Sequence, residues 1–195
     1  MLKEDDATTN ARTDDGIELE KMGLWERLRS NRWTSWGIDL TIMLGIFFAI
    51  TAWQSRSLLG GNEPAPDFSL STLDGKERVS LDGLKGKPTV LVLWAPWCGV
   101  CGAESSTISA LRDSVGEDAN VVSIALEYEE VSEVQGFVDK HGVDYPVLLG
   151  NKQLTDAFKV SAFPTVYILD EEGKVSSSLV GYTSGFGFRW RLWLA

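Results

Sequence analysis

Two cysteines that stand two residues apart, Cys98 and Cys101, constrain the fold of this chain more than any other feature. The apolar run before them, residues 90–94, predicts a buried strand, and residues 103–115 after them predict a helix. Cys98 should therefore stand at the start of a helix, where unpaired N–H groups and the helix dipole favour a thiolate over a thiol. We expect Cys98 to be the nucleophile and Cys101, one turn inside the helix, to be the more buried resolving thiol.

A redox-active dithiol accounts for this pair better than a structural disulfide or a zinc site. A disulfide across so short a loop removes little entropy from the unfolded chain. A structural zinc site needs about four ligands, and the single histidine, His141, is far from the cysteines in sequence. His141 directly precedes Gly142 at the end of a predicted helix, so we expect its role to be structural. We expect no metal and no other cofactor.

The distribution of charge separates an acidic globular part from its N-terminal approach. The 195 residues have a formal net charge of −10, and residues 64–195 hold 18 acidic and 11 basic side chains. An acidic domain without a basic stripe argues against a nucleic-acid partner. Residues 1–36 are polar, first acidic and then basic and aromatic, and we expect them to form a cytoplasmic tail.

The segment 37–53 predicts a single transmembrane anchor. It is apolar except for Asp39, Thr41 and Thr51, and as a helix it spans roughly 25 Å, slightly less than a hydrocarbon core of about 30 Å. Arginines precede the segment and only Arg56 follows it closely. The positive-inside rule then keeps the N-terminus in the cytoplasm and places the rest of the chain outside the membrane.

Two alternatives to an anchor remain open. A cleaved signal peptide normally has a short charged region, whereas 36 residues precede this apolar run and no clear cleavage site follows it. A buried helix of a soluble protein would need a partner, and nothing later in the chain resembles one. Gly60, Gly61 and then Pro64 indicate a linker over residues 54–63, so we expect the globular domain to span residues 64–195.

The globular part alternates between strand and helix patterns, which predicts an α/β domain. It opens with a β-hairpin around Asp74 and Gly75. The order strand, helix, strand, helix, strand up to residue 149 implies parallel strands, and the last two strands read as an antiparallel pair. The result is a mixed central sheet covered on both faces by helices. The expected helices are 98–114, 130–140 and 152–158, and the expected strands are 67–73, 79–81, 89–94, 121–126, 145–149, 165–169 and 174–181.

The end of the chain, residues 185–195, is rich in aromatic and basic side chains. It predicts a short last helix packed on the sheet. The alternative is contact with a membrane surface, in which Arg189 and Arg191 meet lipid phosphates and Trp193 lies at the interface.

Two motifs resemble the thioredoxin superfamily. They are Trp97-Cys98-Gly99-Val100-Cys101 after a strand and Phe163-Pro164-Thr165 before a strand–turn–strand. The resemblance implies a thioredoxin fold with Cys98 and Cys101 as its catalytic pair. It also implies a cis Phe163-Pro164 bond beside the cysteines, a minority state for X–Pro bonds. The backbone of Phe163 would then pair with an extended substrate, and Trp97 would shield one side of the reactive sulfur.

Further motifs are similar to the membrane-tethered TlpA/DsbE-like group. They are the opening from Pro66 to Gly75, the run from Leu84 to Pro88, and an extra helix–strand unit at about 130–149. The group implies thiol–disulfide exchange outside the cytoplasmic membrane. Its electron donor would be an integral membrane thiol reductase, and its substrates would be periplasmic protein disulfides. The ending from Gly181 to Trp193 looks most like the suppressor-of-copper-sensitivity protein D branch, which implies a setting of copper or oxidative stress.

Some positions depart from these families. Thioredoxin has a buried aspartate where this chain has Val92, so proton handling must differ. Glu127, at the end of the strand 121–126, is the candidate acid–base group, with a solvated surface acid as the alternative. Gly99-Val100 replaces the Gly-Pro pair of thioredoxin, a dipeptide that tunes the potential in that family. Peroxiredoxins have Thr or Ser three residues before their cysteine, and Ala95 here disfavours peroxidase activity.

The predicted reaction is the reduction of protein disulfides. The Cys98 thiolate attacks a substrate disulfide, and Cys101 resolves the mixed disulfide that forms. A disulfide-forming oxidase or isomerase would use the same residues and differ only in potential. A Cu(I)-binding or redox-sensing protein could use the same two thiolates, although the methionines all lie before the domain, at Met1, Met22 and Met43.

Overall fold

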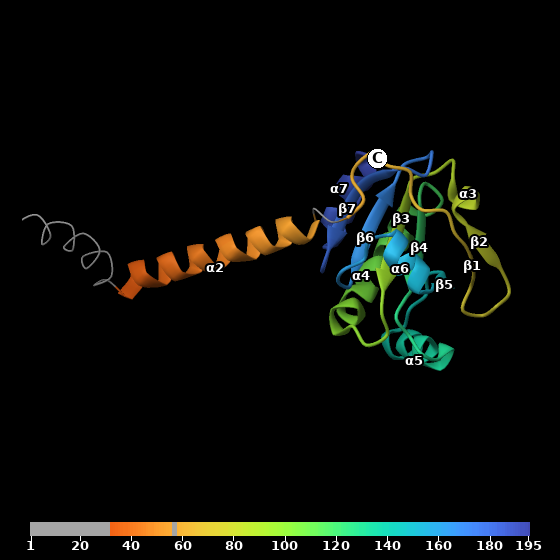
Figure 1. Ribbon diagram of the computed structural model, residues 1–195, viewed down its shortest axis with the longest axis horizontal. Helices are drawn as coiled ribbons and strands as arrows, with labels where there is room; N and C mark the ends of the chain where they lie inside the picture. Colours follow the sequence, from red (N-terminus) through yellow and green to blue (C-terminus); the bar gives the residue numbers. More distant parts are fainter. Residues whose placement is uncertain (1–31, 56–57) are drawn as a thin grey trace, which may run out of the picture. The chain divides into compact units, whose positions relative to one another are not determined.

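The computed structural model describes residues 32–55 and 58–195. Most of the predicted tail, residues 1–31, lies outside the described residues. The chain divides into two compact units between Ile50 and Thr51, and Figure 1 labels the helices and strands of both.

The first described element is α2 (Arg32–Ser55), one continuous helix that includes the whole apolar segment 37–53. The Thr41 hydroxyl donates to the carbonyl of Gly37 at 2.8 Å, so this polar group is satisfied within the helix itself. Among the residues that the structure describes, no helix is long and apolar enough to cross a membrane. The anchor over 37–53 stays a prediction.

The domain is built on a five-stranded sheet in the order β5-β4-β3-β6-β7. The central strand β3 (Thr89–Trp94) pairs parallel with β4 (Asn120–Ala125), which pairs parallel with β5 (Val147–Leu149). On the other side of β3, β6 (Thr165–Leu169) and β7 (Val175–Val180) are added antiparallel. The predicted mixed sheet is confirmed.

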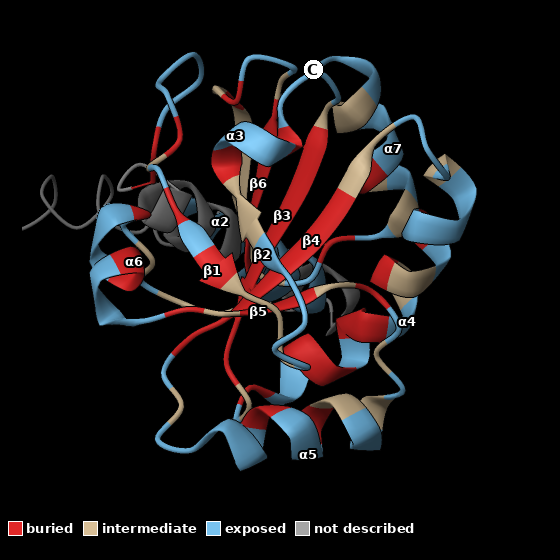
Figure 2. Cartoon of the chain, turned by 90° about the vertical axis from the view of Figure 1, so that its right-hand side faces the viewer, coloured by how far each residue is buried: buried red, intermediate tan, exposed pale blue. Residues whose placement is uncertain are grey.

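Helices cover both faces of the sheet because successive residues of the buried strand β3 point to opposite sides. Leu91 and Leu93 join one apolar cluster, whereas Val90, Val92 and Trp94 join another. Figure 2 shows the buried residues concentrated in the strands and in the helix faces turned toward them. The first cluster includes residues of α3 (Leu81–Leu84) and α6 (Lys152–Ala157), and the second includes residues of α4 (Gly99–Val115), α5 (Val131–His141) and α7 (Gly185–Trp193).

The predicted N-terminal hairpin and the inserted helix–strand unit are both present. β1 (Ser69–Ser71) and β2 (Arg78–Ser80) pair antiparallel. The N–H of Leu73 donates to the carbonyl of Val147 at 2.8 Å, so the hairpin covers the edge strand β5 of the inserted unit. Leu81, expected in a strand, instead begins α3, because the Ser80 hydroxyl caps that helix.

The chain joins the domain earlier than residue 64, within the segment expected to be a linker. Leu58 and Leu59 are buried in the core. The Ser178 hydroxyl donates to the carbonyl of Leu59 at 3.3 Å, and the N–H of Val175 donates to the carbonyl of Glu63 at 2.8 Å. These contacts hold residues 58–63 against β7.

Candidate active site

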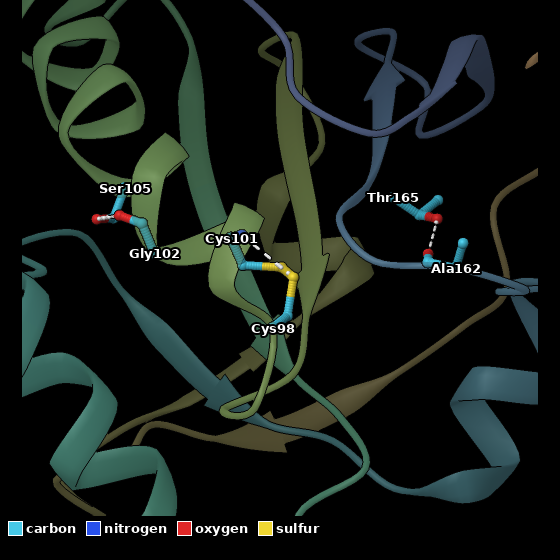
Figure 3. Close-up of a disulfide and its surroundings, with 6 residues drawn as sticks. All are labelled: Cys98, Cys101, Gly102, Ser105, Ala162 and Thr165. Carbon is cyan, nitrogen blue, oxygen red and sulfur yellow. Dashed lines mark hydrogen bonds between the residues drawn. A yellow bond between two sulfur atoms is a disulfide. The ribbon is translucent and has the colours of Figure 1, made fainter. Parts of the chain in front are cut away.

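The two cysteines lie where β3 passes into α4, and a disulfide joins them (Figure 3). Cys98 is the N-cap of α4, and its Sγ accepts the N–H of Cys101 at 3.1 Å. The N–H of Cys98 donates to the carbonyl of Ala95 at 3.0 Å, which fixes the loop that leaves the strand. The position of Cys98 at the first turn of a helix is therefore confirmed.

This position favours negative charge on the sulfur of Cys98 once the disulfide is reduced. Cys98 faces the start of a 17-residue helix whose first turn contains no acidic side chain. The free N–H groups and the helix dipole there stabilise a thiolate. Cys101 lies one turn further along α4 and is the more buried residue, 4% exposed against 7% for Cys98.

Trp97 directly precedes Cys98 and is 65% exposed, unlike the cysteines. Its Nε1 donates to the backbone carbonyl of Glu127 at 3.2 Å. Its ring meets that of Phe163 edge to face, with centroids 5.5 Å apart. The structure thus brings together Trp97, Phe163 and the end of β4, three parts that are distant in sequence.

The Phe163-Pro164 bond is cis, as the resemblance implies. The antiparallel register places Thr165 opposite Leu93, so Pro164 lies beside the end of β3 that leads to the cysteines. The Pro164 carbonyl accepts the N–H of Gly181 at 2.8 Å. Among the described residues, the backbone of Phe163 makes no hydrogen bond to another backbone group.

Glu104, on α4, is a buried acid that the sequence analysis missed. The residue is 0% exposed, and its Oε1 accepts the N–H of Thr183 at 2.6 Å. Its Oε2 is buried and has no hydrogen-bond partner among the described residues. Burial raises the pKa of Glu104 to about 7, although the Thr183 N–H opposes the shift.

The spacing of Glu104 was the signal that could have identified it. Cys98, Cys101 and Glu104 follow each other at intervals of three, which keeps them near one face of a helix. That face is turned inward, because Ser105 and Ile108 on the same helix are also buried. A carboxyl group next to a buried thiol in such a place is suited to proton transfer.

The predicted acid–base residue, Glu127, contacts the site through its backbone carbonyl, which accepts the Nε1–H of Trp97, whereas its side chain is exposed. Its φ of 49° is in the left-handed region, so the chain turns sharply where β4 ends. Glu127 also borders a cavity of about 720 Å³ whose walls include Tyr128, Asn151 and Lys152. Its acid–base role stays a prediction.

His141 contacts α4 immediately after the second cysteine. A Cβ added at Gly102 would lie 2.6 Å from Nε2 of His141, so only glycine allows this approach. The imidazole packs on Phe137, with centroids 4.6 Å apart, and Phe137 stacks on Trp94 at 4.1 Å. A row of rings therefore connects α5 with the end of β3, which agrees with a structural role for His141.

Residues 32–55 and 58–195 contain no group of three or more His, Cys, Asp or Glu side chains placed to hold a metal ion. The groups that the site brings together are two sulfurs, one buried carboxyl group, the exposed Trp97 and the half-buried Phe163. This set is sufficient for exchange between a dithiol and a disulfide.

Comparisons with known proteins agree with this chemistry. The sequence model of the AhpC/TSA family matches residues 62–178. The thioredoxin-like protein YneN of Bacillus subtilis (strain 168) is 35% identical over 149 residues, which cover 72% of this chain and 87% of YneN. The thiol–disulfide oxidoreductase ResA of the same organism is 28% identical over 149 residues, which cover 74% of this chain and 82% of ResA.

Solved structures show the same fold. A thiol:disulfide interchange protein of the thioredoxin family from Chlorobium tepidum TLS is 29% identical with a TM-score of 0.62, and the match covers 70% of this chain and 97% of that one. The exposed lipoprotein thioredoxin of Streptococcus pneumoniae strain TIGR4 is 28% identical with a TM-score of 0.58, and the match covers 67% of this chain and 100% of that one. The predicted thioredoxin-like α/β fold is confirmed.

Proposed function

The chain belongs to the AhpC/TSA family, as a TlpA/ResA/DsbE-like thiol–disulfide oxidoreductase, and from this premise we propose that it reduces disulfides of proteins outside the cytoplasmic membrane. The observation that carries the proposal is the Cys98–Cys101 disulfide at the N-terminus of α4, beside an exposed aromatic surface. Family membership does not add peroxidase chemistry, because Ala95 offers no hydroxyl near the reactive cysteine.

The reaction begins with the reduced protein. The Cys98 thiolate attacks one sulfur of a substrate disulfide, which forms a mixed disulfide and releases the other substrate sulfur as a thiolate. Cys101 loses its proton and attacks Cys98, which breaks the mixed disulfide and releases the second substrate thiolate. One substrate thiolate gains the proton that Cys101 loses, and the other takes a proton from solvent, which replaces the one that Cys98 lost when it became a thiolate. Two electrons pass to the substrate, and the Cys98–Cys101 disulfide remains.

Glu104 is suited to take the proton from Cys101 in the second step. The two residues are three apart on the inward face of α4, and both are buried. A carboxyl group with a pKa of about 7 exchanges protons readily near neutral pH. In this proposal Glu104 performs the acid–base function that the sequence analysis assigned to Glu127.

Trp97 and Phe163 supply the surface on which a substrate lies. The Trp97 ring is exposed, and its Nε1–H donates a hydrogen bond to the carbonyl of Glu127. The backbone groups of Phe163 can pair with an extended substrate segment that presents its disulfide to Cys98. In this proposal, side chains of the substrate segment enter the cavity that Glu127 borders.

The proposed location is the outer face of the cytoplasmic membrane, with residues 37–53 as the anchor and the N-terminus inside. The uninterrupted helix α2 over this segment and the arginines before it support the proposal. An integral membrane thiol reductase would return electrons to the disulfide, and periplasmic protein disulfides would receive them. A role in copper or oxidative stress rests on the resemblance of residues 181–193 alone.

Trapping of the mixed disulfide tests the proposed reaction. In a Cys101→Ala protein, Cys98 attacks but the intermediate cannot be resolved, so covalent complexes with substrate proteins should accumulate in cells and disappear when a reductant is added. Cys98→Ala is the matched control and should trap nothing. A parallel sample treated with an alkylating reagent shows whether Cys98 of Cys101→Ala is a free thiol. If it is free and no complexes form, the proposal is contradicted.

The anchor has its own test. Alkaline phosphatase fused after residue 63 should be active, because it folds only outside the cytoplasm, whereas a fusion after residue 36 should be inactive. Two inactive fusions that are both made in full would contradict the proposed topology.

A further inference from the structure

The last helix, α7, has two unlike faces. Phe188 is fully buried, and Leu192 packs against the same core cluster. On the other side Phe186, Trp190 and Trp193 are 79%, 53% and 75% exposed. At about 100° per residue, these three positions lie within an arc of about 60°, roughly opposite the buried face. They form one outward aromatic stripe, defined by Phe186, Trp190 and Trp193.

The aromatic stripe is held in place by the rest of the domain. The rings of Trp190 and Trp193 contact each other, with centroids 5.4 Å apart. Ser184 caps the helix, because its hydroxyl accepts the N–H of Gly187 at 3.3 Å. The preceding residue, Thr183, is bound to the buried Glu104. The stripe is therefore exposed on a helix that packs against the core and is fixed at its N-terminus.

Charge distinguishes this end of the domain from the remainder. Residues 64–172 carry 18 acidic and 8 basic side chains, whereas residues 173–195 carry three basic side chains and no acidic one. Arg189 is exposed and lies at the edge of the aromatic stripe. Arg191 turns back and donates to the carbonyl of Gly187 at 3.2 Å. An anionic surface would therefore repel most of the domain but not α7, whose only charged side chains are Arg189 and Arg191.

We propose that α7 binds the headgroup region of an anionic phospholipid bilayer, with its aromatic stripe at the interface and Arg189 on lipid phosphates. Tryptophan favours this region because its ring is apolar and its N–H needs a polar partner. A second copy of the chain fits less well, because two aromatic stripes in contact would bring together two α7 helices, each with two arginines and no acidic side chain. The inference does not depend on the reaction or on the anchor.

Vesicle binding by residues 58–195 tests the proposal without the contribution of α2. This segment contains both apolar clusters from Leu58 onward and lies within the compact unit Thr51–Ala195. The domain should sediment with vesicles of equal parts phosphatidylcholine and phosphatidylglycerol. Its affinity for them should be about tenfold or more above that for phosphatidylcholine alone, and it should fall as salt is added.

Three variants separate the contributions to binding. The triple variant Phe186→Ser, Trp190→Ser, Trp193→Ser should lose binding to both kinds of vesicle. Arg189→Gln should weaken binding to anionic vesicles about fivefold and leave binding to neutral ones unchanged. Val131→Ser removes an exposed apolar side chain at the start of α5 and is the matched control, with unchanged binding. Each variant should still exchange disulfides with a small aromatic disulfide, which shows that it is folded.

Three results would overturn the proposal. The first is a folded triple variant that binds anionic vesicles as well as the parent domain does. The second is a parent domain that binds neither kind of vesicle. The third is a concentration-dependent dimer that the triple variant abolishes, because the stripe would then be covered by a second copy and not by lipid.

Discussion

Gly102 and His141 are in such close contact that a methyl group on Gly102 would lie 2.6 Å from Nε2 and 2.9 Å from Nδ1 of the imidazole. Gly102 directly follows the second redox cysteine on α4, and His141 is the last residue of α5. The inserted helix–strand unit is thus packed against the first turn of the helix that carries the disulfide.

Gly102→Ala should destabilise the oxidised protein by about 1–3 kcal/mol, because the clash exceeds the gain in helix propensity. Gly136→Ala, in the middle of α5 with open space around its Cβ, is the matched control and should be neutral or stabilising. The free energy of unfolding in urea measures both. In the His141→Ala background the cost of Gly102→Ala should largely vanish, and an unchanged cost would contradict the contact.

Glu104 should make the stability of the oxidised protein depend on pH. Its pKa in the folded protein, about 7, is above the ordinary value of 4.5, so the folded state binds the proton more tightly than the unfolded state. The stabilisation is therefore complete below pH 4.5 and is lost as the pH rises through 7. Urea unfolding from pH 4 to 8 should show a loss of up to about 3 kcal/mol that Glu104→Gln removes.

The exposed Glu129 supplies the control for this series. Glu129→Gln should keep the pH dependence of the parent protein.

Glu104→Gln should also slow the resolution of a mixed disulfide at pH 7 by at least about tenfold, since the proton acceptor for Cys101 is gone. If Glu127→Gln slows this step and Glu104→Gln does not, the acid–base role belongs to Glu127, as the sequence alone suggested.

Trp97→Ala should separate substrate docking from sulfur chemistry. The exposed ring touches Phe163 but fills no part of the core, so the stability should change by less than about 1 kcal/mol. The KM for a protein disulfide should rise several-fold, whereas the rate with a small aromatic disulfide should stay the same. Phe186→Ala, at an exposed aromatic position on α7, is the matched control. Equal losses with both substrates would argue against docking on Trp97.

The main features of the fold could be predicted from the sequence because its signals are local. The apolar run before Cys98 and the alternation of strand and helix patterns predict β3, α4 and the mixed sheet. The start of the domain could not be placed as well, since Gly60 and Gly61 indicate a linker. Leu58 and Leu59, just before them, are buried only because a distant strand, β7, receives the segment.

Only the part of the candidate site that depends on local sequence motifs could be predicted. Cys98, Cys101 and Trp97 belong to one continuous motif, and Phe163-Pro164 to another. Glu104 was missed because its burial depends on Thr183, which is 79 residues away and supplies the hydrogen bond that the carboxyl group needs. Pattern analysis favoured Glu127 because it ends a strand, but the structure shows that Glu127 contacts Trp97 through its carbonyl.

The redox state of Cys98 and Cys101 in living cells tests the proposed direction of electron flow most directly. Cells would be quenched with acid, free thiols labelled with a reagent that adds mass, and the two states separated on a gel. We predict that the pair is mostly reduced, because a membrane donor keeps it so in an oxidising compartment. A pair that is mostly oxidised in growing cells, with a potential near the value of about −120 mV typical of a strong oxidant, would contradict the reductase assignment.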